Sequence, residues 1–185
     1  QALQTVNPAN ASVGLSQLTA TGTKDATTFL RGDNTFAVAG GTNTPAFSAE
    51  RSGDQTISNT TRTTILFNNE FYDSSSAYDT STGKFTPQVA GKYFVNANVQ
   101  LNTNSNSNLS YAFIEMYKNT SIITEDVEDT RANYGRKTTC DVTTIVDMNG
   151  SSDFILIQAF IAEVSASGAA TVRDMSTFQA FKIIE

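Results

Sequence analysis

The chain has 185 residues, which is room for one domain of ordinary size and an appendage, and its net charge is −6. An acidic chain lacks the excess of Lys and Arg that neutralises phosphate groups, so the composition argues against nucleic-acid binding. The sequence has no His and no nucleophile elbow, phosphate-binding loop or Cys/His metal spacing, and we therefore expect a non-enzymatic protein that requires no cofactor.

Residues 1–44 differ in composition from the rest of the chain. They are rich in Ala, Thr, Gly and Asn, contain few large apolar side chains, and end in a linker-like run that starts at Gly40. No apolar run in the chain approaches the about 20 residues of a membrane helix, and the first residues have neither the basic start nor the apolar stretch of a signal peptide. The sequence predicts a neck over residues 1–44, a head over residues 45–185, and no membrane insertion.

Part of the neck resembles a segment of bacteriophage tail fibres and related virion appendages. Residues 22–36 run from small side chains into Leu30-Arg31-Gly32-Asp33, followed by Thr35 and an aromatic residue. The aromatic residue of such segments is usually Trp, and Phe36 stands in its place. The resemblance implies an extended, trimeric fibre neck that leads into the head.

Strand signals begin after the linker. Residues 92–101 alternate between apolar and polar, which predicts a strand with one buried face. Residues 109–117 and 154–161 are apolar on both faces, and their β-branched and aromatic content favours strands over helices. We interpret the second apolar face of these two strands as covered by a neighbouring subunit. Further strands are predicted at residues 46–51, 63–67, 138–146 and 176–184.

The spacing of these strands predicts the fold class. Roughly eight to ten short strands, separated by polar turns and without a helical stripe, are typical of an antiparallel β-sandwich or jelly roll. The only Cys, Cys140, lies among β-forming residues, so we expect a buried structural thiol. One thiol cannot form an internal disulfide, and the fold must be stabilised by packing alone.

A spaced series of aromatic and turn residues in the head resembles the signature of the globular heads of complement C1q, which share a jelly roll with tumour necrosis factor. The series consists of Phe67, Asp73, Tyr78, Phe85, Gly91 and Tyr93. Other segments that look like strands of this family are residues 46–49, 78–86, 91–94, 117–119 and 176–181. The resemblance covers the whole head and implies an all-β, antiparallel C1q-like jelly roll.

The resemblance also carries expectations about packing and assembly. It implies that Phe67, Phe85 and Tyr93 fill the core and that Gly91 needs an unusual backbone angle. Heads of this family pack as homotrimers around a threefold axis and bind partners through exposed loops or grooves between subunits. The sequence departs from the signature at four positions, where Val95 and Ala97 replace aromatic residues and Gln179 and Ala180 replace Gly.

Two polar loops of the head are candidate receptor-binding sites. The first contains amides that can donate and accept hydrogen bonds to a sugar, and its candidates are Asn102, Asn104, Asn106 and Asn108. The second combines Tyr and Arg, which are typical of recognition surfaces, and its candidates are Arg131, Asn133, Tyr134 and Arg136. The alternative for each loop is a segment that only keeps the head soluble.

The densest acidic cluster consists of Glu125, Asp126, Glu128 and Asp129. Clustered carboxylates can hold calcium, which takes six to eight oxygen ligands. The spacing is not that of a calcium-binding loop, so a hydrated run of charges is the alternative.

Together these features predict a non-enzymatic homotrimeric head of a phage tail fibre or virion spike, which binds a glycan or protein on a host cell. One alternative is a structural module that trimerises or caps a fibre, or decorates a capsid, without a receptor. The other is a secreted, extracellular ligand of the C1q and tumour-necrosis-factor type.

Overall fold

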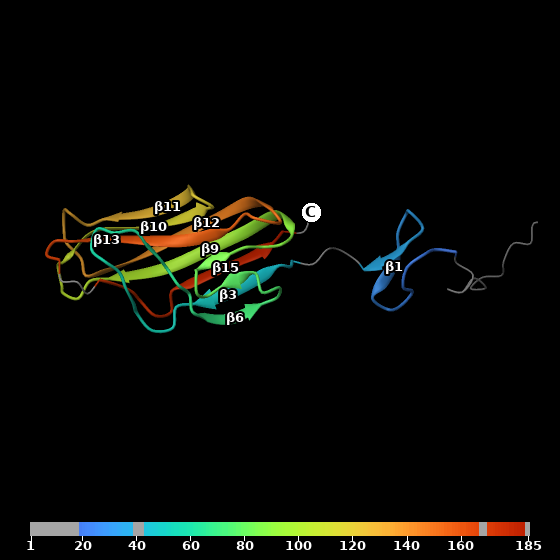
Figure 1. Cartoon of the computed structure of the whole chain (residues 1–185), viewed down its shortest axis with the longest axis horizontal. Coiled ribbons are helices and arrows are strands. Elements are labelled where there is room, and N and C mark those ends of the chain that lie inside the picture. The colour runs from blue at the N-terminus through green and yellow to red at the C-terminus, as the bar shows by residue number, and fades with distance from the viewer. Residues whose placement is uncertain (1–18, 39–42, 167–169, 184–185) are drawn as a thin grey trace, which may run out of the picture. The chain divides into compact units, whose positions relative to one another are not determined.

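A computed structural model describes residues 19–38, 43–166 and 170–183. The chain divides into two compact units, with the boundary between Thr42 and Asn43. Among the described residues no helix is long and apolar enough to cross a membrane. The regular structure of both units consists of β-strands (Figure 1).

The described part of the first unit is a small hairpin. Strands β1 (Thr28–Leu30) and β2 (Phe36–Val38) pair antiparallel, with Leu30 opposite Phe36. Arg31 and Asp33 lie in the turn between them, and the backbone of Asn34 has a φ of 63°. The Asp33 carboxylate accepts hydrogen bonds from the backbone N–H and the hydroxyl of Thr35, which holds the turn closed. The fibre-like segment therefore folds locally as a hairpin, and its relation to fibre necks stays a prediction.

The second unit is a sandwich of two antiparallel sheets (Figure 1). The seven-stranded sheet has the order β4-β14-β9-β15-β3-β6, and β12 also pairs with β9. Its strands are β3 (Ala46–Glu50), β4 (Gln55–Thr56), β6 (Asn69–Asp73), β9 (Ala90–Asn102), β12 (Lys137–Asn149), β14 (Thr171–Val172) and β15 (Thr177–Lys182).

The six-stranded sheet has the order β11-β10-β13-β8-β7, and β5 also pairs with β13. Its strands are β5 (Thr63–Thr64), β7 (Tyr78–Asp79), β8 (Lys84–Phe85), β10 (Leu109–Lys118), β11 (Ser121–Asp129) and β13 (Ile155–Glu163). This arrangement is the predicted all-β jelly roll.

The core lies between the two sheets. Strand β9 shows how the sequence builds it, because every second residue from Tyr93 to Leu101 is fully buried and the residues between them face outward. From the other sheet, Ile114 and Ile157 are also 0% exposed. Val95 and Ala97, which replace aromatic residues of the family signature, are buried without exposure, so the smaller side chains still fill their positions.

Aromatic rings concentrate in one part of this core. Phe47 stacks on Tyr78 with ring centroids 4.6 Å apart, and on Phe85 at 4.7 Å. The Tyr78 hydroxyl accepts a hydrogen bond from the backbone N–H of Phe67, and the Asp73 carboxylate accepts one from the N–H of Tyr78. The signature residues other than Gly91 thus form one connected cluster, which Tyr93 joins through Phe85. Asp73 closes the turn that places Tyr78 in the core.

The seven-stranded sheet contains a glycine with an unusual backbone angle, Gly91, and a buried thiol, Cys140. The backbone of Gly91 has a φ of 138°, and a Cβ there would lie 2.7 Å from the Cε atom of Lys182. Cys140 is 0% exposed, and burial, followed by the charges of Asp126 and Glu128, raises the pKa of its thiol to about 12. The thiol is therefore protonated and inert at neutral pH.

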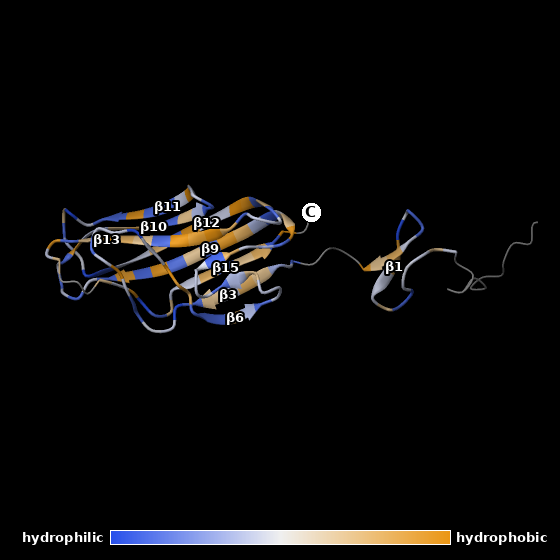
Figure 2. Ribbon diagram, in the orientation of Figure 1, coloured by the Kyte–Doolittle hydropathy of each residue, from blue (hydrophilic) through white to orange (hydrophobic). Residues whose placement is uncertain are grey.

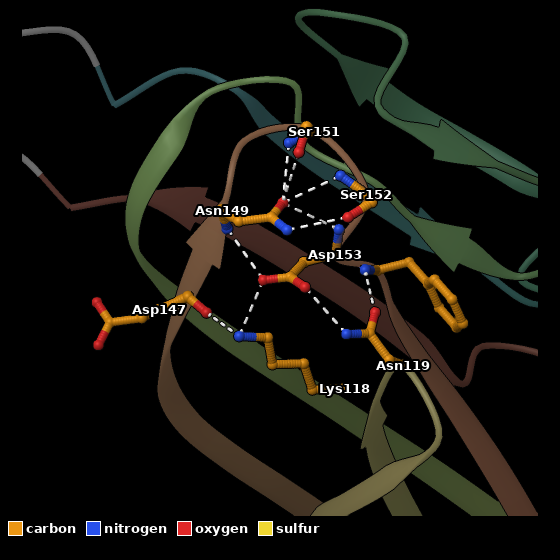
Figure 3. Close-up of polar contacts among 8 residues, drawn as sticks. Lys118, Asn119, Asp147, Asn149, Ser151, Ser152 and Asp153 are labelled. Atoms are coloured by element: carbon orange, nitrogen blue, oxygen red, sulfur yellow. Dashed lines mark hydrogen bonds and ion pairs between the residues drawn. The ribbon is translucent and has the colours of Figure 1, made fainter.

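A polar network fastens two turns at one end of the head. The Asp153 carboxylate accepts hydrogen bonds from the side chains of Lys118 and Asn119 and from the backbone N–H of Asn149, at 2.9 to 3.0 Å (Figure 3). The Asn149 side chain in turn accepts from the backbone N–H groups of Ser151 and Ser152. The bonds from Asn119, Lys118 and the backbone of Asn149 lower the pKa of Asp153. They also tie the β10–β11 turn to the β12–β13 turn.

The strands β10 and β13, predicted to be buried on both faces, are neighbours in the six-stranded sheet. Their outward residues include Phe113 and Leu156, which are 7% and 9% exposed within a single chain. Arg62, from the segment between β4 and β5, covers the Phe113 ring at 5.1 Å. The second apolar face is thus partly covered by the chain itself, and a neighbouring subunit on it stays a prediction.

Candidate functional site

The two predicted receptor-binding loops lie side by side at one end of the head. The backbone N–H groups of Asn108 and Leu109 both donate to the carbonyl of Gly135 at 2.9 Å, and Thr103 N–H donates to the carbonyl of Arg136 at 2.8 Å. These bonds join residues 103–108 to residues 130–136. The exposed residues of the two loops are largely hydrophilic (Figure 2).

This end of the head is remote from the point at which the chain enters it. Near the start of β9, the carbonyl of Lys92 accepts a hydrogen bond from Ile183, and Lys182 donates to the carbonyl of Pro45. Asn102 stands at the other end of β9, ten residues on, which corresponds to about 33 Å in an extended strand. The loops are therefore presented at the end of the head opposite to Pro45 (Figure 1).

A pocket of about 350 Å³ opens beside the loops, lined by Gln100, Asn102, Arg136, Lys137 and Arg173. Register explains why these residues meet. Asn102 on β9 pairs with Lys137 on β12, and the backbone N–H of Arg173, just after β14, donates to the carbonyl of Gln100. Directly paired residues project to the same face of a sheet. The amides of Gln100 and Asn102 on β9 therefore lie between Lys137 on one side and Arg173 on the other.

The three cations of this basic pocket differ in their surroundings. Arg173 forms ion pairs with Asp54 at 2.6 Å and with Asp174 at 3.4 Å. Arg136 and Lys137 are exposed, and their side chains have no hydrogen bond or ion pair within the part of the chain that the structure describes. Two uncompensated positive charges and two amides therefore face the pocket, in a chain whose net charge is −6.

The residues predicted for the first loop separate into three groups. Asn102 lines the basic pocket, and Asn104 and Asn106 are exposed at the tip of the loop. Asn108 is only 4% exposed, and its side chain donates to the Glu163 carboxylate and to the carbonyl of Ser165. Because its amide is used inside the head, Asn108 belongs to the framework of the loop, and a receptor contact at this residue stays a prediction.

The residues predicted for the second loop point in different directions. Arg136 lines the basic pocket, while Asn133 and Tyr134 are exposed outside it. Arg131 lies over the ring of Tyr111 at 5.5 Å and is ion-paired with Asp129. It borders a separate hollow of about 450 Å³ on the six-stranded sheet, lined by Arg62, Ser110, Tyr111, Phe113, Arg131, Phe160 and Ala162.

The acidic residues predicted as a calcium site lie on strand β11, at the edge of the six-stranded sheet. Successive residues of a strand point to opposite faces, so Glu125 and Asp129 project to one side and Asp126 and Glu128 to the other. Asp126 accepts a hydrogen bond from the backbone N–H of Asp141. Within the described ranges no group of three or more acidic, His or Cys side chains could hold a metal ion. Calcium binding at this strand stays a prediction.

Three pocket residues, Gln100, Lys137 and Arg173, were not predicted from the sequence. Gln100 stands inside a predicted strand, and Lys137 directly precedes one. Arg173 lies in a part of the chain without a recognisable pattern. The only local signal for these residues is the outward position of Gln100 in the alternation of residues 92–101. The pocket itself depends on pairing between distant strands, which local sequence does not show.

Comparison with known proteins agrees with this architecture. Residues 46–153 match the model of the C1q domain. The globular domain of the zebrafish complement 1qA protein superposes with a TM-score of 0.56 at 18% identity, over 75% of this chain and 96% of that one. Eiger TNF from S. frugiperda gives 0.55 at 9% identity, over 75% and 91%. Murine APRIL gives 0.53 at 6% identity, over 75% and 98%.

At these identities the structural similarities show a shared fold and nothing more. No curated protein sequence matches the chain. The match to the family model extends over more than half of the chain, from the first strand of the head to the turn before β13. The chain belongs to the C1q domain family.

Proposed function

We propose that the head is a non-enzymatic, homotrimeric binding module of a virion appendage such as a phage tail fibre, and that it binds a glycan or protein on the surface of a host cell. The observation that carries this proposal is the basic pocket with its two adjoining loops. A rigid sandwich presents them at the end of the head remote from Pro45, where a tethered head is free to meet a surface.

Assembly is part of the proposal because C1q domains commonly form homotrimers. A trimer would present three equivalent pockets, so contacts that are weak singly would combine into firm attachment. The fibre-like neck favours a virion over a secreted ligand of the C1q and tumour-necrosis-factor type. A virion appendage and a secreted ligand would both place the head outside cells.

The test is binding of the fluorescently labelled full chain to panels of bacterial and animal cells. We expect saturable binding to one group of cells, and loss of binding in the variant Asn104→Ala/Asn106→Ala/Arg136→Ala with its oligomeric state unchanged. Binding to bacteria would support the virion role, and binding to animal cells alone would favour the secreted ligand. Intact oligomers that bind no cell surface would contradict the proposal and favour a capping module.

A further inference from the structure

We infer that the basic pocket binds a saccharide that carries a negatively charged group. This inference rests on the proposed function and names the chemical class of the ligand. The pocket combines exposed cations and amides on one sheet face, and its volume of about 350 Å³ falls within the range of small-ligand sites.

The positive charges of the pocket select an anion. Arg136 and Lys137 are neighbours at the start of β12, and neither side chain is engaged elsewhere in the described part of the chain. Arg173 faces them across β9 and is fixed by its ion pair with Asp54 at 2.6 Å. A guanidinium and an ammonium together supply charge-assisted hydrogen bonds to a carboxylate, sulfate or phosphate oxygen.

The amides of the pocket select hydroxyl groups beside that anion. Gln100 and Asn102 project from alternate positions of β9 to the same face. An amide side chain has both donors and acceptors, so it can bind a sugar hydroxyl in either sense. A ligand with one anionic group and several adjacent hydroxyls satisfies both parts of the lining, which a simple inorganic anion does not.

The surroundings of the pocket limit the ligand to a locally charged molecule. Asp54 and Asp174 border Arg173, and the whole chain has a net charge of −6. Extended polyanions would meet this acidic surface beyond the pocket, and at about 0.1 M salt charges interact over about 10 Å. A saccharide with isolated anionic groups avoids that repulsion.

The first experiment measures binding of the full chain to an array of neutral, carboxylated, sulfated and phosphorylated saccharides, with an acidic peptide as a further probe. We expect anionic saccharides to bind best. The comparison among them shows whether the pocket prefers a carboxylate, a sulfate or a phosphate group. Preference for neutral saccharides, binding of the acidic peptide alone, or no saccharide binding would each overturn the inference.

The second experiment compares sialyllactose, sulfated lactose and lactose by titration calorimetry, because the three share one core. The charged ligands should bind at least about tenfold more tightly than lactose, and raising the salt concentration should weaken only their binding. Equal affinity for all three ligands would contradict a role for charge.

Variants connect this preference to the pocket. Arg136→Ala/Lys137→Ala should weaken binding of the preferred anionic saccharide at least about tenfold, and Arg136→Lys/Lys137→Arg should retain most of it. The control Lys92→Ala/Lys182→Ala removes the same charge from the opposite end of the same sheet and should leave binding unchanged. Equal losses in the two alanine variants would show an effect of net charge and overturn the assignment of the pocket.

Failure of this inference can be told apart from failure of the proposed function. If the full chain binds cells and Arg136→Ala/Lys137→Ala binds them equally well, the head is a binding module that uses another surface. If the chain binds no cells, the proposed function itself fails.

Discussion

Tyr93 shows how a single aromatic residue contributes to the packing of the head. Tyr93 is 0% exposed, its ring meets Phe85 edge-on at 5.7 Å, and its hydroxyl donates to the carbonyl of Val89 at 2.8 Å. Burial raises the pKa of this hydroxyl to about 12, so it remains a neutral donor over the physiological range. Tyr93 therefore contributes both apolar packing and one local hydrogen bond.

Replacing Tyr93 by Ala should lower the free energy of unfolding by about 3–5 kcal/mol, because it leaves a cavity between the sheets. Tyr93→Phe keeps the ring and loses only the bond to Val89, so it should cost about 0.5–1.5 kcal/mol. Denaturant unfolding, measured at one fixed protein concentration, compares the two variants. Equal stability of Tyr93→Ala and the unmodified chain would refute the packing described for this residue.

At the scale of elements, the ion pair between Arg62 and Glu115 fastens the β4–β5 segment to the outer face of β10. Glu115 is 2% exposed and accepts two hydrogen bonds from Arg62, at 2.7 and 2.9 Å, and one from the Tyr117 hydroxyl. The bonds from Arg62, and after them the bond from Tyr117, lower the pKa of Glu115 below its ordinary value. The folded head therefore favours the ionised form of Glu115 over the protonated form.

This lowered pKa predicts a pH dependence of stability. The ionised Glu115 stabilises the folded state fully above the pKa of an unfolded Glu, about 4.3, and the contribution is lost as the pH falls through the lower folded pKa. Glu115→Gln should be less stable by about 1–3 kcal/mol at pH 7 and should lose less stability on acidification. Unfolding free energies measured between about pH 7 and pH 3 provide the test, and parallel curves for the two proteins would contradict it.

The elements also show what the sequence could predict and what it could not. The sequence predicts strand β9 because buried and outward residues alternate from Tyr93 to Leu101, and it predicts β10 and β13 because their residues are apolar on both faces. Strand β11 is not among the strands predicted from the sequence, because its acidic cluster indicates a calcium site or a hydrated run of charges; in the structure Asp126 and Glu128 are half-buried, and Glu125 and Asp129 are exposed. Its strand conformation depends on pairing with β10, which local sequence does not encode.

At the scale of the whole molecule, the candidate site depends on long-range register. Asn102 and Arg136 were predicted separately, and the pairing of Lys137 with Asn102 brings them to one pocket. The burial of Asn108 could not be foreseen, because it depends on Glu163 and Ser165 at the end of β13. Local patterns identified polar loops, but which amides face solvent is decided by distant partners.

The division of the chain leads to a prediction about the neck. The head has its own core between Ala46 and Ala180, and the boundary of the two compact units lies between Thr42 and Asn43. Deleting residues 1–41 should therefore leave a folded head with an unchanged strand spectrum by circular dichroism and a cooperative thermal transition. An unfolded truncated chain would show that the neck is part of the folding unit.

The most direct test of the account is the mass of the full chain in solution, measured by light scattering with and without a calcium chelator. A binding head of this family should have the mass of three chains of 19.9 kDa each. If the chelator dissociates the trimer, calcium is part of the assembly, and if it does not, packing alone holds the subunits together. A mass of one chain at micromolar concentrations would contradict the trimeric head, and with it the argument that three weak pockets combine at a surface.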